Sequence, residues 1–271
     1  MAFVQSRGVD VHYVAYGASR EWAERTIVVL HGYTLDHRSA VAVFEPAFHG
    51  RDGWRRLYLD FPGMGRTRAP DWVASTDDVL EVTAGAVDGL VDGPYALAGI
   101  SFGGYVAAGV AAGDPDRVTG LALVVPMVKD RPGRQLGDFA VLHRDVDVVA
   151  SDELDQMVVV QTATVLSRVR DEIDAAAELA DEPVIERIDA RYGGSFPLSA
   201  PGGFDKPALV LVGRQDDVLG YADQWSEYGR WPRATFAVLD SAGHLLPLEQ
   251  AALTDALVAD WLDRVEQLPP G

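Results

Sequence analysis

The strongest constraint on the fold of this chain is the stretch P-Y-A-L-A-G-I-S-F-G-G at residues 94–104. Residues 95–98 form a short apolar run, which is typical of a buried strand. Alanine, valine and glycine dominate residues 104–113, a composition that favours a helix packed closely against a sheet. Ser101 therefore lies where a strand turns sharply into a helix. This geometry predicts a strained backbone and an exposed hydroxyl group at Ser101.

Residues 99–103 of this turn have the pattern G-x-S-x-G. We expect glycine at both ends because a side chain there would collide with the neighbouring strand or helix. A serine above the sheet edge, beside the free amides of a helix N-terminus, suits a nucleophile whose oxyanion product those amides stabilise. The alternative is a glycine-rich turn that contains a serine by chance. Only partners elsewhere in the chain distinguish the two.

Partners for Ser101 follow the last two predicted strands. A serine hydroxyl is a poor nucleophile until a base removes its proton. Of the six histidines, His244 alone lies in a loop directly after the last predicted strand, and we predict it as the general base. Its imidazole needs a carboxylate, and Asp216 and Asp217 both follow the preceding strand. We choose Asp216 and expect Asp217 to cap the next helix.

Apolar strands and amphipathic helices alternate along most of the chain. Residues 3–14 predict an antiparallel hairpin. Further strands are expected at residues 26–30, 54–59, 95–98, 118–125, 207–212 and 234–239. Helices are expected at residues 37–48, 76–91, 104–113, 221–229 and 248–265. This alternation predicts an α/β fold with a mainly parallel, doubly wound sheet.

The alternation breaks at Pro126. Residues 127–204 contain no convincing strand, and helices are expected at residues 151–165, 167–179 and 183–192. This stretch is far longer than an ordinary connection, so we predict a helical cap inserted over the upper edge of the sheet. The core then comprises residues 1–126 and 205–271, and the cap comprises residues 127–204.

Composition excludes several classes of function. The formal net charge is −18, which argues against binding to nucleic acid or to anionic membranes. The chain has no cysteine, so disulfides, thiolate metal sites and a cysteine nucleophile are excluded. We see no signal peptide and no apolar run that could span a bilayer, and we expect a cytoplasmic protein. No metal cluster, phosphate loop or dinucleotide fingerprint is visible, so we expect no cofactor and no metal.

Five motifs, in this order, resemble those of the α/β-hydrolase superfamily. They are H-G-Y at residues 31–33, D-F-P-G-M-G at 60–65, G-I-S-F-G-G at 99–104, G-R-Q-D at 213–216 and A-G-H at 242–244. The resemblance covers nearly the whole chain and implies a central sheet of about eight strands with a helical cap. It also implies an oxyanion hole formed by the backbone N–H groups of Tyr33 and Phe102. We expect His31 and Arg66 to hold loops in place.

Three functions are compatible with these motifs. The first is a serine hydrolase that cleaves a small carboxylic ester, lactone or amide through an acyl-enzyme. The second is a carbon–carbon bond hydrolase of the meta-cleavage type, and the third is a non-hydrolytic, ligand-binding protein of the same fold. A binding protein has no need for a serine with both partners. Meta-cleavage hydrolases commonly carry tryptophan directly after the triad histidine, whereas Leu245 follows His244 here. Ester hydrolysis, lost as His244 becomes protonated in acid, is therefore favoured.

Residues near the nucleophile should select the substrate. From the sheet edge we expect Val218 and Leu245 to contact it, and from the cap Met127, His143 and Tyr192. Their mostly apolar or aromatic character favours a small, largely apolar molecule. The alternative for His143 and Tyr192 is a role in packing alone. The sequence does not predict the oligomeric state.

Overall fold

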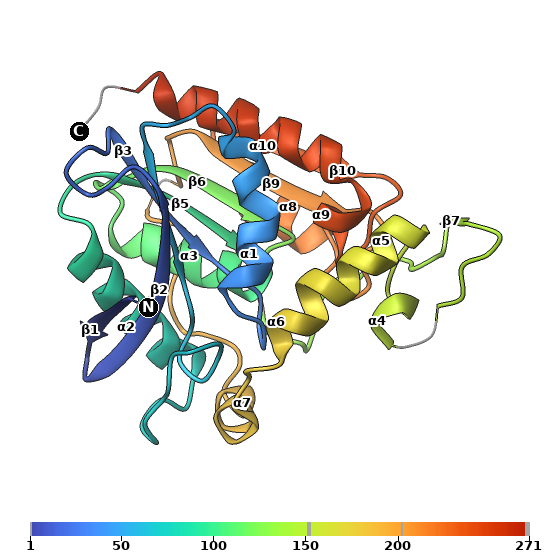
Figure 1. The fold of residues 1–271 in the computed structure, drawn as a ribbon, viewed down its shortest axis with the longest axis horizontal. Coiled ribbons are helices and arrows are strands. Elements are labelled where there is room, and N and C mark those ends of the chain that lie inside the picture. Colours follow the sequence, from blue (N-terminus) through green and yellow to red (C-terminus); the bar gives the residue numbers. More distant parts are fainter. Residues whose placement is uncertain (1, 151–152, 202, 269–271) are drawn as a thin grey trace.

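The computed structural model describes residues 2–150, 153–201 and 203–268. Its large sheet consists of β1 (Ala2–Ser6), β2 (Val9–Gly17), β3 (Arg25–Leu30), β4 (Trp54–Leu59), β5 (Tyr95–Ile100), β6 (Val118–Val124), β9 (Ala208–Gly213) and β10 (Ala234–Leu239). The spatial order of these eight strands is β1-β2-β4-β3-β5-β6-β9-β10 (Figure 1). The pairings β1–β2 and β2–β4 are antiparallel and the others are parallel. The predicted α/β-hydrolase fold, with about eight mostly parallel strands, is confirmed.

Helices cover both faces of the sheet (Figure 1). One face carries α1 (His37–Phe44), the short η1 (Glu45–Phe48) and α10 (Ala251–Glu266), whereas α2 (Thr76–Leu90), α3 (Phe102–Gly113) and α8 (Ala222–Tyr228) pack on the other. Successive residues of a strand point to opposite faces of the sheet. In β3, Ile27 belongs to the hydrophobic core under α1 and α10, and Val28 belongs to the core under α2 and α3. Burial on both faces explains why β5 and β9 contain almost only apolar residues. No helix in the described ranges is both long and apolar enough to cross a membrane.

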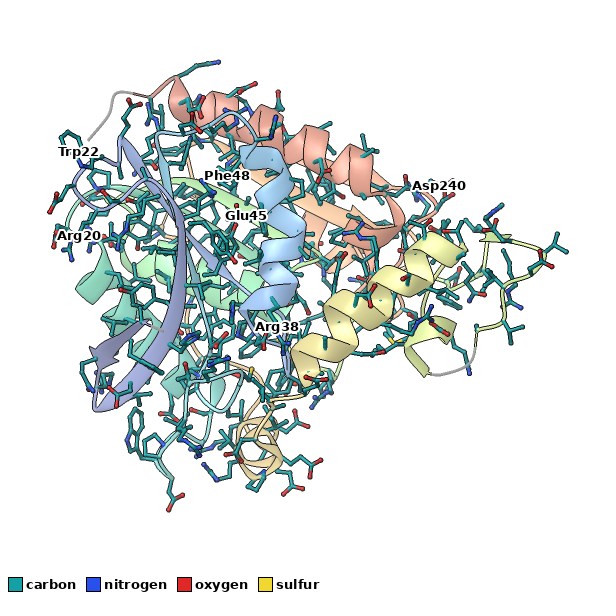
Figure 2. The ribbon with its side chains drawn as sticks, in the orientation of Figure 1. Arg20, Trp22, Arg38, Glu45, Phe48 and Asp240 are labelled. Carbon is teal, nitrogen blue, oxygen red and sulfur yellow. The ribbon has the colours of Figure 1, made fainter. Side chains whose placement is uncertain are left out.

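Between β6 and β9 the chain leaves the sheet for residues 125–207, which we call the β6–β9 segment. Its elements are β7 (His143–Arg144), α4 (Glu153–Gln156), β8 (Val160–Gln161), α5 (Ala163–Arg168), the π-helical turn η2 (Val169–Asp174), α6 (Ala175–Ala177) and α7 (Glu182–Asp189). The segment is anchored to the core. Arg38 at the start of α1 donates a hydrogen bond to the carbonyl of Ala175 on α6 (Figure 2).

The sequence-based description of this segment was partly wrong. A single helix was predicted at residues 151–165, but α4 ends at Gln156 and the chain then becomes extended. The run M-V-V-V at residues 157–160 explains the break, because β-branched side chains favour extended backbone. β8 pairs in parallel with β7, although no strand was expected here. Residues 151–152 of the predicted helix lie outside the described residues.

Candidate active site

Ser101 occupies a strained turn between β5 and α3. Its φ of 54° and ψ of −117° lie outside the regions that non-glycine residues ordinarily adopt. The neighbouring glycines make this turn possible. A Cβ added at Gly99 would lie 2.2 Å from the carbonyl oxygen of Gly103, and one at Gly103 would lie 2.3 Å from that of His31. The requirement for glycine at both positions is confirmed.

We expect Gly103→Ala to lower the free energy of unfolding by about 1–3 kcal/mol, because the added methyl group meets fixed backbone atoms. A thermal or urea unfolding series measures this loss. Gly113→Ala is the matched control, since Gly113 also lies in α3 and a Cβ there would meet nothing within 4 Å. Equal stability of the two variants would contradict the packing argument.

Ser101, His244 and Asp216 form a continuous hydrogen-bonded series, which we call the Ser–His–Asp chain. His244 Nε2 lies 3.1 Å from Ser101 Oγ, and His244 Nδ1 lies 3.0 Å from Asp216 Oδ2. The three residues follow β5, β10 and β9 respectively, so the carboxyl ends of parallel strands bring them together at one edge of the sheet. Ionised Asp216 can only accept a hydrogen bond, so His244 Nδ1 carries the proton and Nε2 is left to accept one from Ser101.

The environment of Asp216 keeps its carboxylate ionised. Asp216 is completely buried, and its Oδ1 accepts hydrogen bonds from the N–H groups of Val218 and Leu219 at 2.8 and 2.9 Å. Burial alone would raise the pKa of Asp216, but the adjacent imidazole of His244 and these two N–H groups hold it below its usual value. Asp217 is exposed, and Tyr221 occupies the N-cap of α8, so the capping role predicted for Asp217 is wrong.

Two backbone N–H groups lie free beside Ser101. Phe102 begins α3, so its N–H has no partner within the helix. Tyr33 follows Gly32, where an added Cβ would lie 3.9 Å from Ser101 Cβ. In the described part of the chain neither N–H donates a hydrogen bond to another protein group. Two such donors beside the serine could stabilise a negatively charged oxygen.

His31 holds the loop that carries Tyr33. Its Nδ1 lies 2.7 Å from the carbonyl oxygen of Gly32, and its Nε2 accepts a hydrogen bond from the N–H of Phe61 at 3.0 Å. Nδ1 therefore carries the proton. Burial lowers the pKa of His31, which favours this neutral form. The backbone N–H of Arg66 donates to Asp60 Oδ2 at 2.9 Å, so this residue also helps to anchor its loop.

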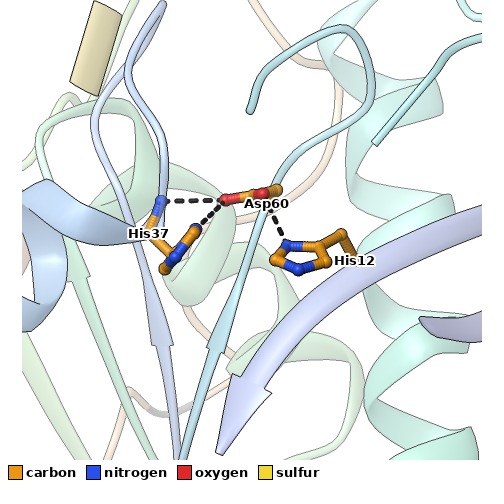
Figure 3. A group of neighbouring side chains, drawn as sticks. All are labelled: His12, His37 and Asp60. Atoms are coloured by element: carbon orange, nitrogen blue, oxygen red, sulfur yellow. Dashed lines mark hydrogen bonds and ion pairs between the residues drawn. The ribbon is translucent and has the colours of Figure 1, made fainter. Parts of the chain in front are cut away.

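A buried cluster of His12, His37 and Asp60 lies behind these loops (Figure 3). The Nδ1 atoms of His12 and His37 lie 2.8 Å from different oxygens of Asp60. Asp60 also accepts from the backbone N–H groups of His37 and Arg66, at 2.8 and 2.9 Å. These residue types can bind a metal, but four donors already occupy both carboxylate oxygens. The geometry therefore fits a hydrogen-bonded anchor of the loop rather than a metal site.

This cluster should make the fold sensitive to acid. Burial lowers the pKa of His12, so below about pH 6.5 the unfolded chain binds a proton that the folded chain resists. Burial would raise the pKa of Asp60, but the hydrogen bonds from the His37 ring and from the Arg66 N–H group hold it well below its usual range. Asp60 therefore contributes stability above about pH 4, and that contribution is lost in stronger acid.

We expect the unfolding temperature to fall between pH 7.5 and pH 5.5, and His12→Asn to flatten this dependence while lowering stability at pH 7.5. The slope of the free energy of unfolding against pH should decrease by at most about 1.4 kcal/mol per pH unit. Calorimetry at several pH values measures it. His49→Asn, which changes an exposed histidine, is the control. Identical slopes in wild type and His12→Asn would show that His12 is not responsible.

A cavity of about 350 Å³ contains the Ser101–His244 contact. Among the residues predicted to contact substrate, Tyr192, Val218 and Leu245 line it, and so does Tyr33. Two further predictions are corrected. Met127 is completely buried in the hydrophobic core, and His143 is exposed on β7, where its ring contacts Asp145. Neither residue lines the cavity, and the residues of the β6–β9 segment that do are Arg131, Arg134, Leu154, Met157, Glu172, Ile173 and Tyr192.

Sequence reasoning missed Glu249, which joins the His244 loop to the β6–β9 segment. Its side chain is buried on α9 (Leu246–Glu249) and accepts hydrogen bonds from the N–H groups of Gly243, at 2.6 Å, and Val159. Burial raises the pKa of Glu249, while these N–H groups oppose that effect. The sequence around Glu249 does not reveal this role, because its partner Val159 is 90 residues away in sequence.

Comparison with known proteins agrees with this architecture. Residues 27–257 match the family described as the alpha/beta hydrolase family. The chain belongs to this family. A solved alpha/beta superfamily hydrolase from Oenococcus oeni is 25% identical, with a TM-score of 0.86, over 98% of this chain and 100% of the other.

Two relatives of this alpha/beta hydrolase are similar in sequence. Lipase LipV of Mycobacterium tuberculosis is 32% identical, over 44% of this chain and 43% of the lipase, so the match spans less than half of either protein. The dihydrolipoyllysine-residue acetyltransferase component of the acetoin cleaving system of Cupriavidus necator is 27% identical, over 96% of this chain and 68% of that protein. Membership of this family leaves the substrate to be argued from the cavity.

Proposed function

We propose that this hydrolase cleaves a small carboxylic ester, lactone or amide through an acyl-enzyme on Ser101. The observation that carries the proposal is the Ser–His–Asp chain opening into a cavity of about 350 Å³. The likeness to a lipase supports ester cleavage, over the part of the chain that it matches. Residues 127–204 serve as a cap in this proposal, since side chains of this stretch close one side of the cavity.

In the first half-reaction, His244 Nε2 takes the proton of Ser101 as Oγ attacks the substrate carbonyl carbon. The carbonyl electron pair moves to its oxygen, which the N–H groups of Phe102 and Tyr33 stabilise. Asp216 holds the imidazole in orientation and stabilises its positive form. When the intermediate collapses, the bond to the leaving oxygen or nitrogen breaks and the leaving atom takes the proton from His244.

The second half-reaction releases the acid. Water attacks the acyl carbonyl while His244 takes one of its protons, and the same N–H groups stabilise the second oxyanion. Collapse breaks the bond to Ser101 Oγ, which recovers its proton from His244. Protons and charges balance over the cycle, so the reaction consumes only the substrate and one water molecule.

A panel of substrates tests this proposal. We expect the purified protein to hydrolyse short p-nitrophenyl esters or a small lactone faster than a vinylogous diketo acid, the substrate type of carbon–carbon hydrolases. Ser101→Ala measures the background. Rapid cleavage of the diketo acid with negligible esterase activity would support carbon–carbon hydrolysis instead. A folded protein that cleaves none of these compounds would support the binding-protein alternative.

A further inference from the structure

Two arginines that sequence reasoning missed line the cavity. Arg131 and Arg134 lie at the start of the β6–β9 segment, and their guanidinium carbons are 4.4 and 5.9 Å from the ring centre of Tyr192. Tyr192 in turn packs against Phe102 and Tyr33, with ring centres 5.6 and 4.9 Å apart. The cationic part of the cavity therefore adjoins the two residues whose N–H groups lie free beside the nucleophile.

Outside the Ser–His–Asp chain, the charges that line the cavity do not cancel. Glu172 is neutralised by Arg168, whose Nε and Nη2 donate to its two oxygens at 2.6 and 2.9 Å. Arg131 pairs with Asp189 at 2.8 Å, near the surface. Arg134 makes no ion pair with any carboxylate in the residues that the structure describes. One positive charge in the cavity lining thus lacks a counter-charge.

The Arg134 side chain is held in place by backbone groups. Its Nε donates to the carbonyl of Lys129 at 3.1 Å, and its Nη1 donates to that of Val218 at 3.3 Å. Its Nη2 is buried with no acceptor among the described residues. Arg134 as a whole is half-buried, but a buried donor without an acceptor is costly, and a nearby anion would reduce that cost. Arg131 is 52% exposed, so its guanidinium supplies the accessible donors.

From this arrangement we infer that the substrate carries a carboxylate, which binds beside Arg131 while the fixed charge of Arg134 stabilises it. The inference rests on the proposed function and names its substrate class. Much of the remaining lining is apolar: Leu35, Val43, Ile100, Leu154, Met157, Ile173, Leu245 and Leu248. The matching molecule has an apolar body and one anionic group, as in a half-ester of a dicarboxylic acid or a carboxylate-bearing lactone.

The overall charge of −18 opposes the approach of an anion. Exposed charges beyond about 10 Å are largely screened at ordinary ionic strength, however. Arg131 and Arg134 line the cavity itself, so their charges act on a bound group at short range, where screening by salt is weakest. Recognition of the anion should therefore depend on these two arginines more than on the net charge.

Two matched pairs of esters test the inference. In the first, mono-p-nitrophenyl glutarate is compared with p-nitrophenyl 5-methylhexanoate, so that the carboxylate is on the acyl side. In the second, 4-acetoxybenzoate is compared with 4-acetoxybenzamide, so that it is on the leaving-group side. We expect wild type to prefer the anionic member of one pair by at least about tenfold in kcat/KM.

Variants show whether the arginines cause this preference. Arg134→Gln and Arg131→Gln should each lower the anionic-to-neutral ratio of kcat/KM by about tenfold or more, and Arg134→Lys should restore part of it. Arg187→Gln is the matched control. Arg187 is also half-buried in the β6–β9 segment with one unpartnered nitrogen, but it does not line the cavity. This control should leave the ratio unchanged.

A preference for the neutral member in both pairs would overturn the inference, as would variants that slow both members equally. If no ester is cleaved, the proposed function fails, and calorimetry then decides the inference alone. Wild type should bind 4-hydroxybenzoate at least about tenfold more tightly than 4-hydroxybenzamide, and Arg134→Gln should lose this difference. Equal binding of the two probes would contradict an anion site.

Discussion

Ser101→Ala is expected to lower kcat for a p-nitrophenyl ester by about 10⁴–10⁶-fold. The hydroxyl oxygen is the atom that attacks the carbonyl, and no other described hydroxyl lies within hydrogen-bond distance of His244. The unfolding temperature should change little, because alanine is small and retains the same backbone. Steady-state kinetics with an active-site titration, alongside circular dichroism, separate lost chemistry from lost folding. Residual activity above about one per cent of wild type would exclude Ser101 as the nucleophile.

Asp216→Asn is expected to lower kcat by about 10²–10⁴-fold. In the wild type, Oδ1 of Asp216 accepts hydrogen bonds from two backbone N–H groups. The side-chain oxygen of asparagine must therefore take the place of Oδ1, and its NH₂ group must face His244. His244 Nδ1 then has to accept a hydrogen bond, which moves the ring proton to Nε2. A protonated Nε2 cannot take the proton of Ser101. Ester kinetics at pH 7–8 measure the loss.

Asp217→Asn is the matched control for this prediction. It makes the same chemical change one residue away, on an exposed side chain. We expect an effect of less than about threefold, as for most surface substitutions. A larger loss in Asp217→Asn than in Asp216→Asn would mean that the other carboxylate orients His244.

Much of the fold could be predicted because local sequence and tertiary structure agree in the core. Strands buried on both faces are largely apolar, and the strands predicted at residues 26–30 and 207–212 agree with β3 and β9 to within one residue at each end. The elbow at Ser101 was predictable for a similar reason. Gly99 and Gly103 lie where backbone approaches backbone, and such close approaches leave a visible glycine pattern.

The β6–β9 segment was harder to predict because its structure depends on contacts remote in sequence. Glu249 binds the backbone at Val159, and no local pattern marks that contact. Met127 and His143 were chosen for residue type, yet one packs into the core and the other lies on an exposed strand. Arg134 was missed because its surroundings, which set it apart from surface arginines, form only when the segment folds over the sheet.

Covalent labelling tests the central claim, that Ser101 is an activated nucleophile, most directly. The protein would be incubated with a fluorophosphonate at pH 7.5, and the adduct located by intact mass and peptide mapping. The account predicts one adduct per chain, on Ser101, with much slower labelling in Asp216→Asn and none in Ser101→Ala. A folded wild-type protein that is not labelled, or is labelled at another residue, would contradict it.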